Sequence, residues 1–174
     1  MNTKKPFRIF STDISTVDKN YSLIRNPALQ AVADSYGCSK GSKDQLNDAQ
    51  FADVAARTSG NRFTEFAGGS SANTLATLSK LMGKEAVDID FLSVVPEKGH
   101  AAALIDAAMK AAELNLVRAK MPEGVEAQEA TSYIFKHENG DKSSLTHPGT
   151  ARQALKKYML KPDMMKDYDA IMVQ

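Results

Sequence analysis

Short apolar runs alternate along this chain with segments whose apolar residues recur at helical spacing. Phe7 to Phe10 and Val87 to Val95 are β-rich runs, whereas Ala72 to Met82 carries leucines three positions apart and is followed by Gly83. We therefore predict two strands and one helix that ends at the glycine. Because strands and helices alternate, the sequence predicts a layered α/β fold with a largely parallel sheet.

The same reasoning places further elements in the same order. It predicts helices at Asp48 to Thr58, Gly99 to Asn115 and Thr150 to Leu160, and strands at Arg62 to Ala67 and Asp169 to Val173. In the two best-defined helices, the side chains expected to face inward are Phe51, Val54 and Ala55 in one, and Leu75, Leu78 and Met82 in the other.

A change of pattern occurs between Thr131 and Thr146, where short β-rich runs flank a turn. Asn139-Gly140 can adopt the positive φ angles of a tight turn, so a β-hairpin is predicted. The last predicted strand, Asp169 to Val173, has no helix behind it to cover the sheet. We therefore expect the 174 residues to be a truncated piece of a larger domain.

Composition excludes several classes of function. The 22 Lys and Arg residues nearly balance the 21 Asp and Glu residues, giving a net charge of +1 without a basic stripe for nucleic acid. The start, MNTKKPFRIF, lacks the apolar core of a signal peptide, and no run of about 18 apolar residues follows. We predict a cytoplasmic protein with neither nucleic acid nor membrane as a partner.

Cysteine and histidine give no sign of a metal site. Cys38 is the only cysteine, which excludes an internal disulfide and a cysteine-built metal centre. His100, His137 and His147 are too far apart in sequence for local ligand spacing. We predict no metal site in this chain.

A glycine-rich segment between a predicted strand and the helix from Ala72 carries the chemistry. Gly68 and Gly69 allow close backbone approach to a ligand, and the free N–H groups of a helix start bind hydroxyls or anions. Asn73 adds an amide that both donates and accepts. A structural turn with serines as a helix cap explains the same residues equally well, so both interpretations stay open. The segment matches neither a Walker loop nor a dinucleotide fingerprint.

The stretch GGSSANTLATLSKLMG resembles the N-terminal signature of the ribokinase (PfkB-type) carbohydrate kinases, with its Gly-Gly pair, its Asn and its closing glycine. The segment from Asp13 to Asp18 is similar to that after the first strand of adenosine-kinase-like members, where an Asp binds sugar hydroxyls. The order of elements agrees over the whole chain. The resemblance implies substrate contacts at Asp13, Gly68, Gly69 and Asn73.

The resemblance also implies the architecture. It is a ribokinase-like three-layer α/β/α sheet, mainly parallel, with a small β-sheet lid whose strands lie within about 14–67 and 116–147. Thr131 and Tyr133 are the lid residues expected near the substrate.

Four departures from the family pattern limit what this chain is expected to do. Arg8-Ile9 stands where the family has Gly-Asn, and Pro96-Glu97 stands where it has Gly and then an acid, so Glu97 either replaces that acid or the contact is lost. The Gly-Ala-Gly-Asp segment that supplies an anion hole and a base does not occur, nor does the Asn-x-x-Glu segment associated with magnesium. No catalytic residue is therefore assigned.

The function implied by the resemblance is ATP-dependent phosphorylation of a sugar or nucleoside hydroxyl by a parent kinase. This chain would supply the substrate-binding half, with ATP and Mg²⁺ bound mainly by a C-terminal half, and would be inactive alone. A homodimer or a C-terminal partner chain is then possible. The alternative is a non-catalytic sugar- or nucleoside-binding or regulatory relative, and a third interpretation is an unrelated α/β protein with a structural Gly68-Gly69 turn.

Overall fold

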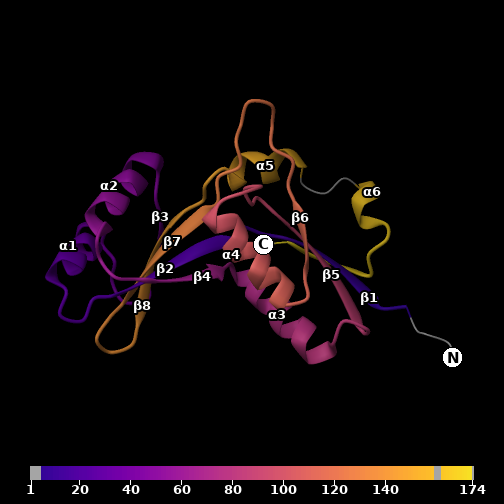
Figure 1. The fold of residues 1–174 in the computed structure, drawn as a ribbon, viewed down its shortest axis with the longest axis horizontal. Coiled ribbons are helices and arrows are strands. Elements are labelled where there is room, and N and C mark those ends of the chain that lie inside the picture. Colours follow the sequence, from indigo (N-terminus) through magenta and orange to yellow (C-terminus); the bar gives the residue numbers. More distant parts are fainter. Residues whose placement is uncertain (1–4, 159–161, 174) are drawn as a thin grey trace. The chain divides into compact units, whose positions relative to one another are not determined.

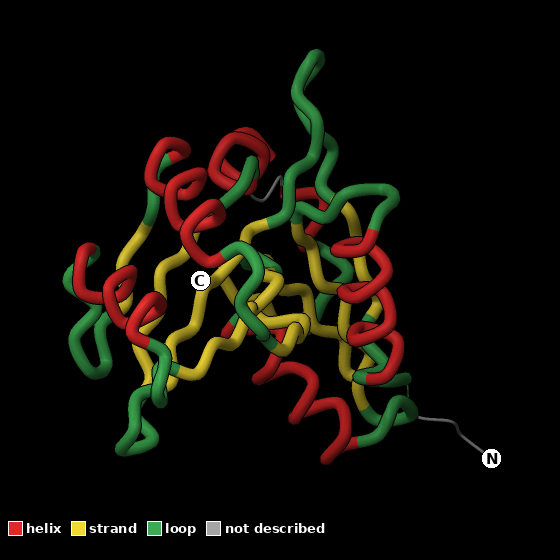
Figure 2. Tube along the Cα trace, turned by 60° about the vertical axis from the view of Figure 1, so that its left-hand side comes forward, coloured by secondary structure: helices red, strands yellow, loops and turns green. Residues whose placement is uncertain are grey.

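The computed structural model describes residues 5–158 and 162–173, which form two compact units. The first unit consists of Met1–Ser15, Ala67–Glu129 and Thr150–Gln174, and the second of Thr16–Phe66 and Ala130–Gly149. Each unit has its own sheet and its own helices (Figures 1 and 2).

The first unit contains a four-stranded parallel sheet in the order β6-β5-β1-β9. Its strands are β1 (Phe7–Thr12), β5 (Val87–Ser93), β6 (Asn115–Arg118) and β9 (Ala170–Val173), and its helices are α3 (Ser70–Met82), α4 (His100–Ala111), α5 (Ala151–Tyr158) and α6 (Pro162–Met165). Helix α3 packs against β5, and α4 packs against β6 (Figure 1). The predicted α/β fold with parallel strands is confirmed.

Apolar and acidic residues alternate along the first part of β5, which gives the strand two unlike faces. Val87, Ile89 and Phe91 are buried on one face, while Asp88 and Asp90 between them are half-buried on the other. Successive strand residues point to opposite faces, so the apolar set packs into the core of the unit.

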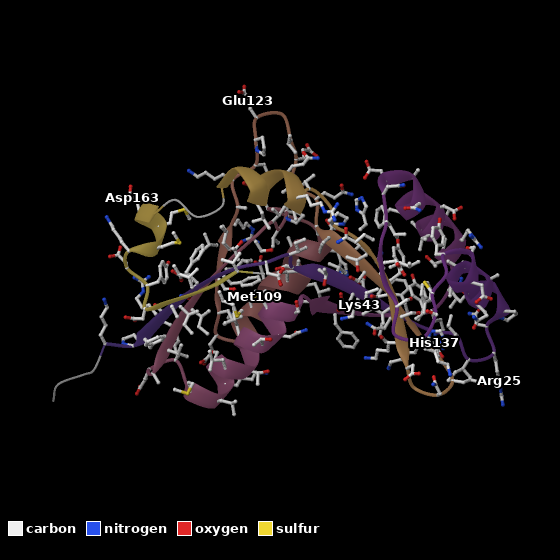
Figure 3. The ribbon with its side chains drawn as sticks, turned by 180° about the vertical axis from the view of Figure 1, so that it is seen from behind. Arg25, Lys43, Met109, Glu123, His137 and Asp163 are labelled. Carbon is white, nitrogen blue, oxygen red and sulfur yellow. The ribbon has the colours of Figure 1, made fainter. Side chains whose placement is uncertain are left out.

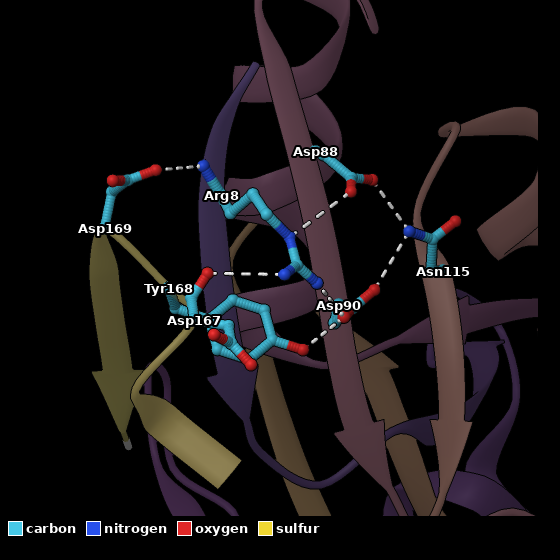
Figure 4. Close-up of polar contacts among 7 residues, drawn as sticks. All are labelled: Arg8, Asp88, Asp90, Asn115, Asp167, Tyr168 and Asp169. Atoms are coloured by element: carbon cyan, nitrogen blue, oxygen red, sulfur yellow. Dashed lines mark hydrogen bonds and ion pairs between the residues drawn. The ribbon is translucent and has the colours of Figure 1, made fainter. Parts of the chain in front are cut away.

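The two aspartates on the opposite face belong to a polar network centred on Arg8 of β1 (Figure 4). The guanidinium of Arg8 lies 3.7 Å from Asp88 and 3.4 Å from Asp90, and it stacks 4.5 Å from the ring centroid of Tyr168. The Tyr168 hydroxyl donates to Asp90, and the Arg8 backbone N–H donates to Asp169 at 2.7 Å. The network therefore links β1 and β5 to the segment that leads into β9.

The second unit contains a five-stranded mixed sheet in the order β3-β8-β7-β2-β4. Its strands are β2 (Thr16–Ser22), β3 (Lys43–Gln45), β4 (Thr64–Gly68), β7 (Ala130–Lys136) and β8 (Lys142–His147), and its helices are α1 (Pro27–Ser35) and α2 (Asp48–Thr58). Strands β7 and β8 pair antiparallel across the Asn139-Gly140 turn. The predicted hairpin is confirmed.

Helices α1 and α2 cover one face of this second sheet. Its buried core joins side chains of both helices to those of three strands: Tyr21, Leu29, Val32, Val54, Tyr133, Phe135 and Leu145. Burial of these large apolar side chains is the main force that holds the unit together.

The ends of α2 are where they were predicted, but one of its inward residues is not. Asn47 and Gln50 form a reciprocal capping box at its start. Val54 is fully buried and Phe51 packs against the core, whereas Ala55 is exposed. Thr58 is buried instead, because its hydroxyl donates to the Val54 carbonyl at 2.8 Å and so needs no partner elsewhere.

Two further expectations need correction. Met82 is 56% exposed, because α3 places Leu75 and small residues such as Ser79 against the sheet and turns its last residues outward. Residues 115–118 form β6 of the first sheet, so the second sheet uses only the part of the range 116–147 that begins at Ala130.

Among the residues described, no helix combines the length and apolar character needed to cross a bilayer.

The phenols of Tyr133 and Tyr168 make the stability of the fold depend on pH in the alkaline range. Burial is the main cause that raises the pKa of Tyr133 and of Tyr168 from 10.0 to about 12, and the hydrogen bond to Asp90 adds to the rise at Tyr168. Since the folded-state pKa exceeds the unfolded one, the neutral phenol stabilises the fold below pH about 10, and this contribution is lost towards pH 12. We expect urea midpoints to fall over that range, and to fall less in Tyr168→Phe, which has no phenol to ionise. Equal pH dependence of the two proteins would contradict the assignment.

Candidate functional site

Asp13 lies directly after β1 and binds the start of α3 with its carboxylate. One oxygen, Oδ1, accepts from the Ile14 N–H at 2.7 Å, and Oδ2 accepts from the Ser71 N–H at 3.2 Å and from the Ser70 hydroxyl at 3.5 Å. The N-cap residue of α3 is Gly69, which has no side chain to cap the helix. Asp13, in the loop after β1, therefore supplies the cap, at a helix end where the dipole favours a negative charge.

Ser93 at the end of β5 fixes the backbone on either side of Ile14. Its hydroxyl donates to the Asp13 carbonyl at 2.8 Å and accepts from the Ser15 N–H at 2.8 Å. The carboxyl ends of β1 and β5 are thus joined by one buried side chain. Ligands of open α/β sheets bind at this edge.

Gly69 brings the α3 start close to the chain after β1. Its φ is +115°, and a Cβ placed there would lie 2.8 Å from the Ile14 carbonyl oxygen. Any other residue would be strained by this φ and would clash with backbone. Gly68 precedes it as the buried last residue of β4. Close packing against the backbone at Ile14 therefore requires a glycine at position 69.

Asn73 has no such structural task. It lies in the first turn of α3, where its N–H donates to the Gly69 carbonyl at 3.1 Å, and its side chain is exposed. Within the described residues, its side-chain amide has no hydrogen-bond partner. The structure thus brings Asp13, Gly69 and Asn73 together at one helix start and leaves only the Asn73 amide uncommitted.

Sequence reasoning missed three hydroxyls next to Asp13. Ser11, Thr12 and Ser15 are buried, and in the part of the chain that the structure describes their side-chain oxygens have no hydrogen-bond partner. A buried hydroxyl without a partner costs about 1–3 kcal/mol, so water or a ligand group would stabilise each one. Three hydroxyl residues within and just after an apolar strand were the available signal.

The arrangement can bind hydroxyl groups. Asp13 has lone pairs left to accept from a hydroxyl, and Asn73 can both donate and accept. Among the residues described, no three His, Cys, Asp or Glu side chains gather to hold a metal ion. The geometry therefore fits recognition of a polyhydroxylated molecule.

Thr131 and Tyr133, expected near a substrate, are buried in the second unit. Tyr133 is 2% exposed and lies among Tyr21, Phe51 and Phe135, on the sheet face that α1 and α2 cover. Thr131 is also buried, at 4% exposure. The pleat of β7 accounts for this placement, because its odd-numbered residues point to the helix side. The placement supports a core role for both residues.

Ser132, between them, points to the face of the second sheet opposite α1 and α2, where Asp18 of β2 is its register partner. Asp18 accepts from the Thr16 hydroxyl at 2.7 Å, and the Ser132 hydroxyl lies 2.9 Å from that of Thr146. Burial raises the pKa of the Asp18 carboxyl, and hydrogen bonds from Thr16 and Ser132 lower it by less. This face is polar and hydroxyl-rich.

Two of the residues that depart from the family pattern, Arg8 and Glu97, lie in different surroundings. Arg8 is a structural residue of the network around Asp88 and Asp90. Glu97 lines a cavity of about 750 Å³ with Pro96 and Arg118, beyond the carboxyl ends of β5 and β6.

Comparisons with known proteins identify the fold. No family model matches the chain, and no curated protein matches it. Solved structures do: adenosine kinase from Sinorhizobium meliloti has a TM-score of 0.73 at 18% identity, and a probable sugar kinase from Rhizobium etli has 0.71 at 18%. Adenosine kinase from Anopheles gambiae, solved with a diadenosine tetraphosphate, has 0.71 at 10%.

These matches cover 95–97% of this chain but only 46–47% of the kinase chains. The fold is therefore the ribokinase-like α/β fold, and the chain spans about half the length of the kinases that it matches. The shared fold argues against the third interpretation, in which the chain is an unrelated α/β protein.

The packing at Gly69 can be tested against a second glycine at the other end of α3. Gly69 and Gly83 both have positive φ and extended ψ, but only Gly69 has a backbone atom within 4 Å of a built Cβ. We expect Gly83→Ala to cost about 1–3 kcal/mol from backbone strain, and Gly69→Ala about 1–3 kcal/mol more from the clash with Ile14. Urea denaturation measures both. Equal losses in the two variants would show that the contact to Ile14 is not tight.

Proposed function

We propose that this chain is the substrate-binding portion of a kinase that phosphorylates a hydroxyl of a sugar or nucleoside with ATP. The observation that carries the proposal is the junction of Asp13 with the α3 start, at the carboxyl edge of a parallel sheet. The neighbouring structures named as adenosine and sugar kinases support it through the shared fold. Asp13 and Asn73 are the proposed contacts to ligand hydroxyls.

The second unit is proposed to act as the lid over the bound substrate. The sheet face opposite α1 and α2 carries Thr16, Asp18 and Ser132, whose polar groups suit a hydroxylated ligand better than an apolar one. A lid excludes water from phosphoryl transfer and so prevents hydrolysis of ATP.

ATP and Mg²⁺ are assigned no residues in this chain. Magnesium in kinases is held by carboxylates and phosphates, and the described residues contain no such cluster. The proposal therefore gives this chain the binding and orientation of the hydroxyl, and gives the phosphates and a base to residues outside it. We also propose that the protein acts in the cytoplasm and that it pairs with a second copy of itself or with a C-terminal partner chain.

A binding or regulatory protein without chemistry is the rival function. It is favoured by Arg8, which belongs to a structural network and is not available to a ligand. Both functions require the site at Asp13 and differ only in whether transfer follows binding.

Ligand binding is tested with adenosine and D-ribose as probes, by calorimetric titration of the 174-residue protein. We expect Asn73→Ala to weaken the affinity of the bound probe about 5- to 100-fold, since it removes a hydrogen-bonding amide, and to leave the free energy of unfolding unchanged. Thr77→Ala, one turn further along the exposed face of α3, is the control and should bind as the wild type does. Unchanged affinity in Asn73→Ala would remove this residue from the site.

Transfer is tested with the same protein, ATP, Mg²⁺ and each probe in a coupled assay for ADP. We expect no turnover above a protein-free blank, because electrostatic stabilisation of the transferred phosphate is the largest catalytic contribution and no donor set for it is assigned here. Turnover that Asn73→Ala abolishes would show that this chain carries the catalytic groups as well.

A further inference from the structure

A cavity of about 570 Å³ lies at one end of the second unit and contains no residue of the site described above. It is formed by the loop between β2 and α1, the turn before β3, and the turn between β7 and β8. Figure 3 labels two of its residues, Arg25 and His137, which come from segments far apart in the sequence. Its lining residues are Leu23, Arg25, Asn26, Pro27, Gln30, Lys40, His137, Glu138 and Asn139.

Backbone hydrogen bonds hold all three segments in place. The Leu23 N–H donates to the Lys136 carbonyl at 3.0 Å, and the Gly41 N–H donates to the Lys142 carbonyl at 3.0 Å. The His137 N–H donates to the Asp141 carbonyl at 2.9 Å and closes the hairpin turn. The side chains that line the cavity therefore extend from a fixed frame.

The cations of this cavity are not neutralised within the unit. Among the described residues, neither Arg25 nor Lys40 has an ion-pair or hydrogen-bond partner for its side chain. Glu138 is the one acidic residue in the lining, and it forms no ion pair with either of them. The His137 ring is held by one nitrogen, because its Nε2 lies 3.0 Å from the Ser143 hydroxyl, and Nδ1 is left for a ligand.

Two backbone features add to this positive charge. Arg25 has a φ of +56°, the left-handed region that a glycine would adopt without strain, so a side chain is kept here at a cost in stability. Helix α1 begins two residues later with no acidic residue in its first turn. The partial positive charge of its N-terminus is therefore not balanced by its own first turn.

We propose that this cavity binds the phosphate group of a small phosphorylated metabolite, with Arg25, Lys40 and His137 as its contacts. A charge-assisted fork from Arg25 and a point charge from Lys40 fit a phosphate monoester. The volume exceeds that of the phosphate alone, and Leu23 and Pro27 provide apolar wall for the organic remainder. The inference does not depend on the proposed kinase function.

The test is calorimetric titration of the 174-residue protein with inorganic phosphate and with ribose 5-phosphate at constant ionic strength. We expect saturable binding of both, tighter for ribose 5-phosphate, and at least about a 10-fold loss of affinity in the double variant Arg25→Ala, Lys40→Ala. Lys136→Ala is the matched control, because Lys136 is an exposed cation of the same hairpin that does not line the cavity.

A second variant separates binding from folding. Arg25→Gly relieves the left-handed strain, so we expect the thermal midpoint to rise by about 2–4 °C while phosphate affinity falls. The proposal is overturned if the wild type shows no saturable binding, or if the double variant binds as tightly as the wild type. It is also overturned if Lys136→Ala loses as much affinity as the double variant, since the attraction would then be general. Equal affinity for the two anions would contradict the role of Leu23 and Pro27.

Discussion

The Asp13 carboxylate and the start of α3 hold each other in place, and the other features of the candidate site depend on this contact. Gly69 allows it, because only a residue without a side chain lets the α3 start approach the Ile14 carbonyl so closely. Ser93 supports it from β5 by bonding the backbone on both sides of Ile14. A carboxylate fixed in this way would lose little further conformational entropy on binding a ligand.

The structural interpretation of the glycine-rich segment is therefore compatible with the ligand-binding role proposed for it. Gly69 is needed for packing, as the structural interpretation requires. The α3 start that it brings to Asp13 also carries Asn73, whose side-chain amide has no hydrogen-bond partner among the described residues. The three buried hydroxyls at Ser11, Thr12 and Ser15 are a second observation in favour of a ligand site, because they have no hydrogen-bond partner among the described residues and lie close in sequence to Asp13. A folded chain tolerates buried hydroxyls of this kind when a ligand or a water molecule forms hydrogen bonds with them.

The sequence predicts the order and type of elements well, because periodicity depends on local burial. The ends of α2 and the β7–β8 hairpin are confirmed. Periodicity alone does not show which apolar residues are covered by another element. It therefore predicts Ala55 and Met82 to face inward, although both are exposed. It also does not show strand partners, so β6 was placed near the lid.

Tertiary contacts between distant segments account for what was missed in the site. The family resemblance indicated Asp13 and Asn73, but the bond from Asp13 to Ser71 spans 58 positions and has no local signal. The role of Arg8 is similar, since its partners Asp88, Asp90 and Tyr168 come from two other segments. The family resemblance predicts Tyr133 as a lid residue near the substrate, and the sequence alone does not show which sheet face the helices cover.

The central claim, that the Asp13 junction is a ligand-binding site, is tested most directly by amide chemical shifts during a titration of the ¹⁵N-labelled protein with adenosine and with D-ribose. The account predicts that the amides of Ile14, Gly69, Ser71 and Asn73 shift together and saturate at one concentration, because Ile14 and Ser71 donate to the Asp13 carboxylate and Gly69 and Asn73 belong to the same α3 start. No shift at these four amides while others saturate, or no saturable shift with either probe, would contradict it.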